Sequence, residues 1–441
     1  MVVLIKIAQL LLSLSILVLV HEFGHFIAAK IFKVRVEKFY IFFNPWFTLF
    51  KKQVGETEYG IGWLPLGGYV KLSGMIDESL DTDQMKSEPK SYEFRTKPAW
   101  QRFIIMVAGV VMNIVLAIVI YILAMWIWGE QYLHNSEVKY GIAVDSIGYE
   151  MGLRNGDKII SVDNVVYEDF YEIPAAIILE KAETIQVERD GKNENIVIPD
   201  GYISKIIKSG SGSFITPRIP FIIGGFTEVS AAKDAGMQVG DKIIAIDGKP
   251  VYFDEFREEV KNYKSATTPI TLIRDGDTLT LMVNISDEGM IGAAVQSPLL
   301  SFNITNKDYT LWEAIPAGTI KTFTVVNDYI KQLKLIFSPE VKAYESVGGF
   351  ITIGKIFPDI WNWRAFWSLT AFLSVVLAII NILPIPGLDG GHALFALFEI
   401  VTGRKPGDRF LINAQVIGMF ILLALIIFAN GNDIIRLFSG K

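Results

Sequence analysis

Long apolar runs alternate with polar stretches along the 441-residue chain and predict four membrane-spanning helices. A helix needs about 20 mostly apolar residues to cross a bilayer. Such runs predict spans at residues 2–31, 103–128, 366–387 and 410–428. In the first run, Lys6 precedes a long apolar stretch, as a basic residue does in a signal peptide. However, no small-residue cleavage site follows that stretch. We therefore expect this segment to be retained.

The polar region between the second and third runs contains an internal repeat. GLRNGDKIISVDN at residues 152–164 recurs as GMQVGDKIIAIDG at residues 236–248, and VERDGK is matched later by LIRDGD. Each copy has a glycine turn, a β-branched strand, an Asp-Asn or Asp-Gly turn, a helix and a hairpin around Asp-Gly. The repeat predicts two inserted α+β domains, at 129–207 and 214–300.

The remaining segments complete a domain plan. Residues 1–128 and 366–441 form the two parts of a membrane core, and residues 301–365 link the inserts to it. In this linker, apolar residues recur at helical spacing among Lys321, Lys331 and Lys334. That pattern indicates either an amphipathic helix at the membrane surface or an ordinary packed helix.

The distribution of charge predicts the orientation of the chain. Twelve lysines and arginines lie between Lys30 and Arg102, and Arg404, Lys405 and Arg409 lie between the last two spans. Short loops rich in lysine and arginine face the cytoplasm, so both chain ends and the long insert are expected outside. The net charge of −6, without recurring basic blocks, argues against a nucleic-acid partner.

The composition limits the metal chemistry that the chain can support. More than half of the residues are hydrophobic, which fits an integral membrane protein with a sizeable soluble part. There is no cysteine, so a transition metal would be held by His, Asp or Glu. The only histidines are His21, His25, His134 and His392.

Two of these histidines form the motif HEFGH at the end of the first apolar run. His21 and His25 are four residues apart, so in a helix they lie on one face about 6 Å from each other. Both can reach one zinc ion, with Glu22 beside it as a general base. Ionisable groups inside a span are costly and point to function, whereas two buried histidines that only satisfy neighbouring helices are the alternative.

A catalytic zinc site needs a third protein ligand, and NILPIPGLDGGH at residues 381–392 offers two. The residues alone favour Asp389 slightly and leave His392 open. Pro384 and Pro386 break the helix there, which is tolerable where backbone lines a protein-enclosed cavity. Asn381 is a candidate to hydrogen-bond a substrate backbone or an oxyanion, or simply another helix. Asn113 is expected to make only a bond between helices.

Taken together, these motifs resemble the site-2 protease family of intramembrane zinc metalloproteases. The features are H-E-x-x-H in the first span, N-x-x-P-x-P-x-L-D-G in the third, and a tandem PDZ-like insert. Within the family, the chain is similar to the bacterial type that has two PDZ domains. The resemblance implies a polytopic α-helical membrane protein with four spans, a membrane-associated β-hairpin loop near 55–75, and two PDZ-like domains. It covers essentially the whole chain.

The resemblance also implies roles for particular residues. One Zn²⁺ per chain would be held by His21, His25 and Asp389, with Glu22 as general base and Asn381 near the substrate. GIGWLPLGGYVKLSG at residues 60–74 matches the family's β-loop, whose edge would pair with unwound substrate. The residues expected to bind substrate there are Gly67, Gly68, Tyr69 and Val70. Two positions depart from the family pattern, with Val110 and Gly349 where prolines are usual.

These expectations define an enzyme and its partners. It would hydrolyse a peptide bond in or near the transmembrane segment of a single-pass protein within the lipid bilayer of the bacterial inner membrane. Membrane-bound anti-sigma factors and remnant signal peptides are the implied substrates. The PDZ-like pair would filter substrates by size or bind peptide tails. The alternatives are an inert zinc-stabilised scaffold and a metal transporter, and a transporter would need more histidine and acidic residues along its spans than this chain has.

Overall fold

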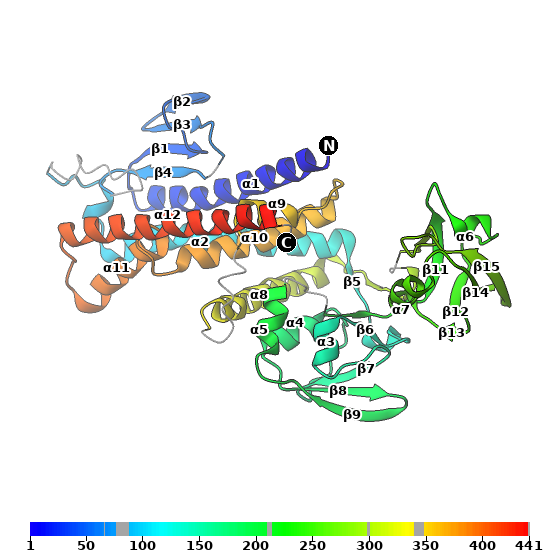
Figure 1. Ribbon diagram of the computed structural model, residues 1–441. Coiled ribbons are helices and arrows are strands. Elements are labelled where there is room, and N and C mark those ends of the chain that lie inside the picture. Colours follow the sequence, from blue (N-terminus) through cyan, green and yellow to red (C-terminus); the bar gives the residue numbers. More distant parts are fainter. Residues whose placement is uncertain (66, 76–87, 210–213, 298–299, 339–347, 440–441) are drawn as a thin grey trace. The chain divides into compact units, whose positions relative to one another are not determined.

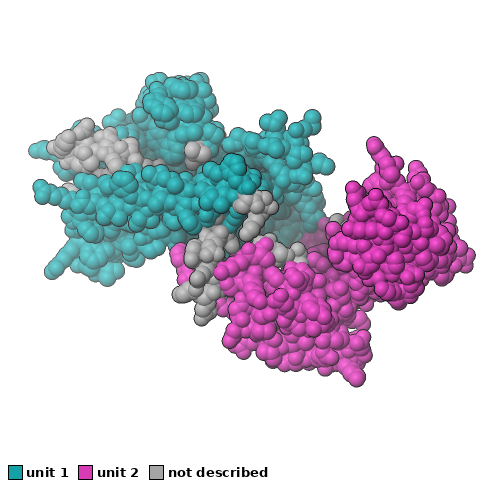
Figure 2. Space-filling model, in the orientation of Figure 1, with its two compact units in different colours: residues 1–129, 308–333, 347–441 teal, residues 130–307, 334–346 magenta. Residues whose placement is uncertain are grey.

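The computed structural model describes residues 1–65, 67–75, 88–209, 214–297, 300–338 and 348–439. Residue 66, within the expected β-loop, lies outside the described part. The chain forms two compact units. The first comprises residues 1–129, 308–333 and 347–441, and the second comprises residues 130–307 and 334–346 (Figure 2).

The four predicted spans are confirmed as long apolar helices of the first unit. Within the described residues, four helices are long and apolar enough to cross a membrane: α1 (Val2–Ile31), α2 (Ala99–Trp128), α10 (Trp363–Ile382) and α12 (Asp408–Ser439) (Figure 1). Helix α10 ends five residues before the predicted boundary at 387. Pro384 and Pro386 follow it closely, and proline lacks the N–H that would continue a helix.

Helix α1 buries one polar face. Its buried positions Gln9, Ser13, Leu17, His21 and His25 recur every four residues and so lie along one side of the helix. Ser13 receives a hydrogen bond of 3.0 Å from Thr370 of α10. The apolar residues on the other sides are largely exposed, which suits contact with lipid.

Glycines let the helices approach closely at the level of the HEFGH motif. A Cβ at Gly24 of α1 would lie 2.5 Å from the Ala108 carbonyl oxygen of α2. A Cβ at Gly418 of α12 would lie 1.5 Å from the Pro386 carbonyl oxygen. Small residues at helix contacts bring backbones together in membranes, where packing replaces the hydrophobic effect as a driving force. The first contact brings α1 against α2, and the second brings α12 against the turn that precedes Asp389.

The β-structure after α1 is larger than the expected hairpin. Its four strands are β1 (Val36–Ile41), β2 (Phe50–Val54), β3 (Thr57–Ile61) and β4 (Tyr69–Leu72), in the order β2-β3-β1-β4. Strands β2 and β3 form a hairpin, β3 runs parallel to β1, and β4 runs antiparallel to β1. Strand β4 therefore stands at the end of the strand order, with β1 as its neighbour on one side.

Three further helices complete the first unit: α8 (Leu311–Ile336), α9 (Phe350–Lys355) and α11 (Asp389–Thr402). Val325, Val326 and Tyr329 of α8 pack against buried Ala117 and Val375. This face of the linker helix is therefore packed against α2 and α10, as in the second of the two alternatives given for the linker. Gly349 caps α9 in place of the proline usual in the family. The Asp433 carboxylate of α12 accepts the Ile351 and Thr352 backbone N–H groups at 3.0 Å.

The second unit contains two lobes that share the order strand, short helix, strand, helix and hairpin, which is the order that the internal repeat predicts. The first lobe has β6 (Ile142–Val144), α3 (Ser146–Glu150), β7 (Lys158–Val162), α4 (Glu172–Leu179), β8 (Thr184–Arg189), β9 (Lys192–Val197), α5 (Tyr202–Ser209) and β10 (Ile215–Pro217). The second lobe has β11 (Phe221–Phe226), α6 (Ala231–Asp234), β12 (Lys242–Ile246), β13 (Lys249–Pro250), α7 (Phe253–Glu259), β14 (Thr267–Arg274), β15 (Asp277–Asn284) and β16 (Ala293–Val295). Strands β5 (Glu130–Tyr132) and β17 (Thr305–Lys307) pair with each other. Because β10 pairs with β6, the first lobe extends to Pro217.

The repeated Gly-Asp and Arg-Asp-Gly residues make the same ion pair in both lobes. Asp157 accepts two bonds of 2.7 Å from Arg189, and Asp241 accepts bonds of 2.8 and 2.7 Å from Arg274. Each aspartate also accepts a backbone N–H at 2.8 Å, and both are 1% exposed. Two-bond pairs of this kind are strong and direction-specific. The repeated residues therefore form the same clamp in each lobe. It joins the start of β7 to the end of β8 in the first lobe, and the start of β12 to the end of β14 in the second.

Removing one partner of this clamp tests its contribution. Arg274→Met leaves the buried Asp241 carboxylate without its cation, so we expect the second lobe to lose stability. Hydrogen exchange of second-lobe peptides in the full chain measures it. Lys261→Met, which removes an exposed pair with Glu258, is the control and should change little.

The same clamp predicts a pH dependence. The Arg274 guanidinium holds the pKa of Asp241 below its ordinary value. The stability that the Asp241–Arg274 pair gives the folded lobe is therefore fully present above the carboxyl pKa of the unfolded chain, about 3.9. This stability is lost as the pH falls through the lower pKa of Asp241 in the folded lobe. Lobe protection in Arg274→Met that equals that of the unmodified chain at neutral pH would contradict this account.

Candidate metal centre and catalytic cavity

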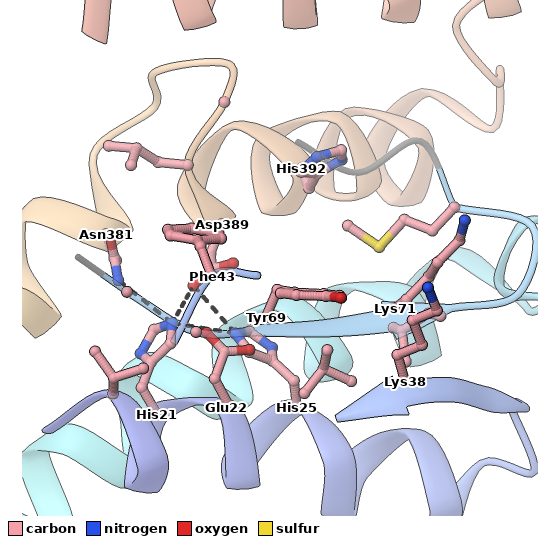
Figure 3. Close-up of a pocket in the computed structure, with 18 of the residues that line it drawn as sticks. His21, Glu22, His25, Lys38, Phe43, Tyr69, Lys71, Asn381, Asp389 and His392 are labelled. Atoms are coloured by element: carbon pink, nitrogen blue, oxygen red, sulfur yellow. Dashed lines mark hydrogen bonds and ion pairs between the residues drawn. The ribbon is translucent and has the colours of Figure 1, made fainter. Parts of the chain in front are cut away.

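The HEFGH motif lies in the second half of α1, where the helix carries three polar side chains toward a cavity. His21 and His25 are both 6% exposed, whereas Glu22 is only partly buried. Figure 3 shows the two imidazoles and the Glu22 carboxylate side by side above the same stretch of helix. The helical spacing thus produces the convergence that the sequence predicts.

Asp389 reaches these histidines from the other end of the chain. Its Oδ2 lies 3.0 Å from His21 Nε2 and 3.2 Å from His25 Nε2, and the two Nε2 atoms are 3.2 Å apart (Figure 3). Among the described residues, these three form the one group with a possible metal-ligand arrangement. Zinc at 2.0–2.1 Å from tetrahedral ligands separates neighbouring ligand atoms by roughly 3.3 Å. The triangle therefore has the size of a zinc site.

The turn before Asp389 is held by glycines. Asp389 is the first residue of α11, and Gly390 and Gly391 pack against the Leu383 and Ile385 carbonyl oxygens, where a Cβ would come within 2.2 and 2.6 Å. Only glycine fits at such short distances. The sequence LPIPGLDGG thus folds back on itself and points the Asp389 carboxylate at α1.

The outer nitrogens of both histidines also have partners, which fixes how the rings face the metal. His25 Nδ1 lies 2.8 Å from the Ile105 carbonyl oxygen, so Nδ1 carries the proton and Nε2 is free to bind a metal. His21 Nδ1 lies 3.1 Å from the Asn113 side-chain amide. Asn113 Oδ1 is buried without a partner among the described residues. Exchanging the assigned O and N of this amide lets Oδ1 accept a hydrogen bond from the His21 Nδ1–H group. Both rings therefore fit a zinc ion.

The two remaining histidines do not belong to this group of ligands. His134 sits in the second unit, where its Nδ1 pairs with Ser136. His392 lines the cavity but is not part of the metal-ligand group (Figure 3). Asn381, from the last turn of α10, places its Nδ2 3.3 Å from His21 Nε2. Of the two third-ligand candidates, the geometry brings Asp389 to the histidines.

A cavity of about 800 Å³ opens in front of the three ligands and Glu22. This volume lies in the ~300–1,000 Å³ range of ligand sites. Gly67, Gly68, Tyr69 and Val70 of the β-loop line one side. A Cβ at Gly68 would lie 2.7 Å from Val18 and 3.5 Å from Glu22 Cγ, so a glycine there lets the strand pass directly beside the general-base candidate.

Sequence reasoning missed two residues of α2 that shape the site. Asn113 was expected to join helices only, but its partner is His21. Gly109 leaves room for both imidazoles, because a Cβ there would lie 2.4 Å from His25 Nε2 and 2.8 Å from His21 Cε1. Both lie with Val110 in AGVVMN, residues 108–113, the stretch in which the sequence departs from the family pattern. Val110, where the family has proline, lies within an unbroken helix.

Adding a methyl group at Gly109 tests this packing. We expect Gly109→Ala to push the His25 ring from its position and to lower the bound zinc of purified protein at least tenfold. Zinc content by mass spectrometry measures the loss. Val111→Leu, which adds volume on an exposed face of α2, should retain zinc. Full zinc occupancy in Gly109→Ala would show that the contact is not restrictive.

Comparison with known proteins gives the family. The model of Peptidase family M50 matches residues 9–425. The regulator of sigma-E protease RseP of Escherichia coli (strain K12) is 30% identical over 456 residues, covering 98% of both chains. The regulator of sigma E protease of Haemophilus influenzae is 26% identical, covering 98% of this chain and 99% of the relative. Protease RseP of Yersinia pestis is 30% identical with the same coverage. The chain therefore belongs to Peptidase family M50, the site-2 protease family, and is a metalloprotease of the inner membrane.

Proposed function

We propose that the protein cleaves single-pass membrane proteins at a peptide bond in or near their transmembrane segment. The observation that carries this proposal is the position of the His21, His25 and Asp389 triangle. It lies among long apolar helices and faces a cavity that also holds Glu22. Ionisable groups at membrane depth persist where they serve a function and are enclosed by protein.

His21, His25 and Asp389 would hold one zinc ion. When bound, zinc lowers the pKa of water and polarises a carbonyl. Glu22 lies one residue from His21 but outside the ligand triangle, so its carboxylate is available to take a proton from the attacking water and pass it to the leaving amine. The Asn381 amide would donate a hydrogen bond to the developing oxyanion, a role supported by its distance of 3.3 Å from His21 Nε2.

The outer edge of β4, the edge that faces away from β1, is the proposed substrate track. A peptide bond in a helix is shielded by the helix's own hydrogen bonds, so the substrate must unwind before hydrolysis. An extended segment can then pair with an exposed strand edge. Gly67, Gly68, Tyr69 and Val70 line the cavity beside Glu22, which puts this edge within reach of the reacting bond. Helix-breaking residues in a substrate should therefore favour cleavage.

We assign the two lobes of the second unit to PDZ-like domains, near residues 129–207 and 214–300, that act outside the cytoplasm. The assignment is supported by the shared element order and by the matching Asp-Arg clamps. The basic loops at 30–102 and 404–409 support cytoplasmic loops and an outside insert. In this position, the lobes would exclude substrates that carry large outer domains, or would bind peptide tails by strand addition.

The names of the relatives suggest the biological role. Several are regulators of sigma E, so membrane-bound anti-sigma factors are the proposed substrates, together with remnant signal peptides. Such a protein would act as the second protease in regulated intramembrane proteolysis. The alternative, an inert zinc-stabilised PDZ scaffold, leaves Glu22 without a purpose, since a structural zinc site needs no general base beside its ligands.

Glu22→Gln separates the protease from the scaffold. The amide keeps the shape of the side chain but cannot accept the proton, so cleavage of a model transmembrane substrate should fall at least a thousandfold while zinc content stays unchanged. Product formation in detergent and zinc content are measured on the same preparation.

The control for Glu22→Gln is His134→Gln, which removes a histidine of the second unit and should leave cleavage intact. Cleavage by Glu22→Gln at the rate of the unmodified chain would refute the mechanism. Loss of zinc together with activity would show instead that Glu22 supports the metal site.

A further inference from the structure

Helix α12 contributes one polar side chain to the catalytic cavity. Gln415 is 4% exposed, yet its side chain lines both the cavity of about 800 Å³ and a smaller neighbouring one. The two cavities share Gln415, His392 and Met75. Gln415 therefore borders both cavities, and it lies on an element that supplies neither a metal ligand nor the general base.

Gln415 differs from the other amides buried in the spans. Three side-chain amides of the described spans are buried: Gln9, Asn113 and Gln415. Gln9 donates to the Pro358 carbonyl oxygen at 2.9 Å, and Asn113 contacts His21 Nδ1 at 3.1 Å. Within the described residues no hydrogen bond is made by the Gln415 side chain, and its amide atoms, unlike Gln9 Oε1 and Asn113 Oδ1, are not among the fully enclosed atoms that lack a partner, so they are accessible from the cavities. An amide in an apolar region without a partner is costly, so its remaining partner is expected to enter from the cavity.

The position of Gln415 is fixed by the backbone contact of the same helix. Gly418, one turn further along α12, packs against the Pro386 carbonyl oxygen with no room for a Cβ. Gly387 in the same turn lies against Leu422 and the Gly418 backbone. Residues three apart lie on one helix face, so Gln415 faces the same turn that carries Asp389. The amide and the metal ligand are thus held by one rigid contact.

An extended substrate has a specific need that an amide meets. A peptide paired along β4 uses the N–H and C=O groups of alternate residues, and the groups of the residues between them point away from the strand. In a cavity at membrane depth, these outward groups lack water as a reliable partner. A glutamine side chain has both a donor and an acceptor, so one amide can bond the outward N–H and C=O of one residue.

We propose that Gln415 completes a substrate clamp: its carboxamide hydrogen-bonds the outward-facing backbone N–H and C=O of one residue of a substrate paired along β4. Gln415 is then a substrate-binding residue of α12. It can bind substrates of different sequence, because it hydrogen-bonds their backbone and not their side chains. The proposal rests on the proposed protease function and on β4 as the substrate track.

Gln415→Met tests the clamp with little change in volume. Loss of two hydrogen bonds to a bound substrate should raise KM for a model transmembrane peptide about tenfold, while kcat stays within about twofold. Zinc content and the melting temperature should match those of the unmodified chain. Gln415→Leu repeats the test with a different side-chain shape. Asn413→Leu, on an exposed position of the same helix, is the matched control and should leave KM unchanged.

A backbone ester scan of the substrate distinguishes the clamp from a structural role. Each peptide N–H near the scissile bond is replaced in turn by an ester oxygen. Esters at positions that face β4 should slow cleavage in both enzymes. One position between them should slow cleavage several-fold in the unmodified enzyme and have no further effect in Gln415→Met.

Two results would overturn the clamp: an unchanged KM in Gln415→Met and Gln415→Leu, or ester effects that are the same in both enzymes at every position. Failure of the protease proposal looks different, because the unmodified chain would then cleave no substrate.

Discussion

Three ligand atoms, His21 Nε2, His25 Nε2 and Asp389 Oδ2, meet within 3.2 Å of one another, and the rest of the membrane unit is arranged around that meeting point. The contact joins residues 364 positions apart in the chain. Charged and polar groups at membrane depth cost free energy unless they are paired with each other, with the backbone or with a metal. The triangle therefore requires that α1, α2 and the start of α11 approach closely and hold their positions.

Glycine makes that approach possible at each contact. Gly24 and Gly109 bring α1 and α2 together beside the histidines, and Gly390 and Gly391 fold the α11 start onto the turn before it. The same residues leave space for the imidazoles, whose outer nitrogens are held by the Ile105 carbonyl and Asn113. The residues that pack α1 against α2 therefore also orient the histidine ligands. On the cavity side, Glu22, the edge of β4 and Gln415 surround the position that a substrate would take.

Much of this could be predicted from the sequence, because the signals were strong and local. Apolar runs gave the spans, the HEFGH spacing gave the face of α1, and the repeated Gly-Asp and Asp-Gly turns gave the element order of the two lobes. Other features depend on contacts between distant residues. The residues alone favoured Asp389 only slightly over His392, three positions further on, since the choice depends on how the PIPG turn folds.

Residues whose role depends on a partner elsewhere in the chain were also missed. In the sequence, Asn113 and Gly109 look like ordinary interior residues of a span, and only their contacts with α1 show that they position the histidines. Gln415 likewise has no recognisable role until the structure places it at the cavity. The β-loop was expected as a hairpin, but parallel pairing of β1 with β3 makes a four-stranded sheet. Such pairing has no local sequence signal, because its partners are joined through long-range contacts.

The identity of the three ligands is tested most directly by zinc X-ray absorption on the purified protein. Imidazole rings give a distinctive scattering pattern, so the spectrum counts the histidines bound to the metal. The account predicts two imidazoles and an oxygen ligand, a spectrum unchanged in His392→Gln, and loss of zinc in Asp389→Asn. Three imidazoles, or retention of zinc in Asp389→Asn with loss in His392→Gln, would contradict it.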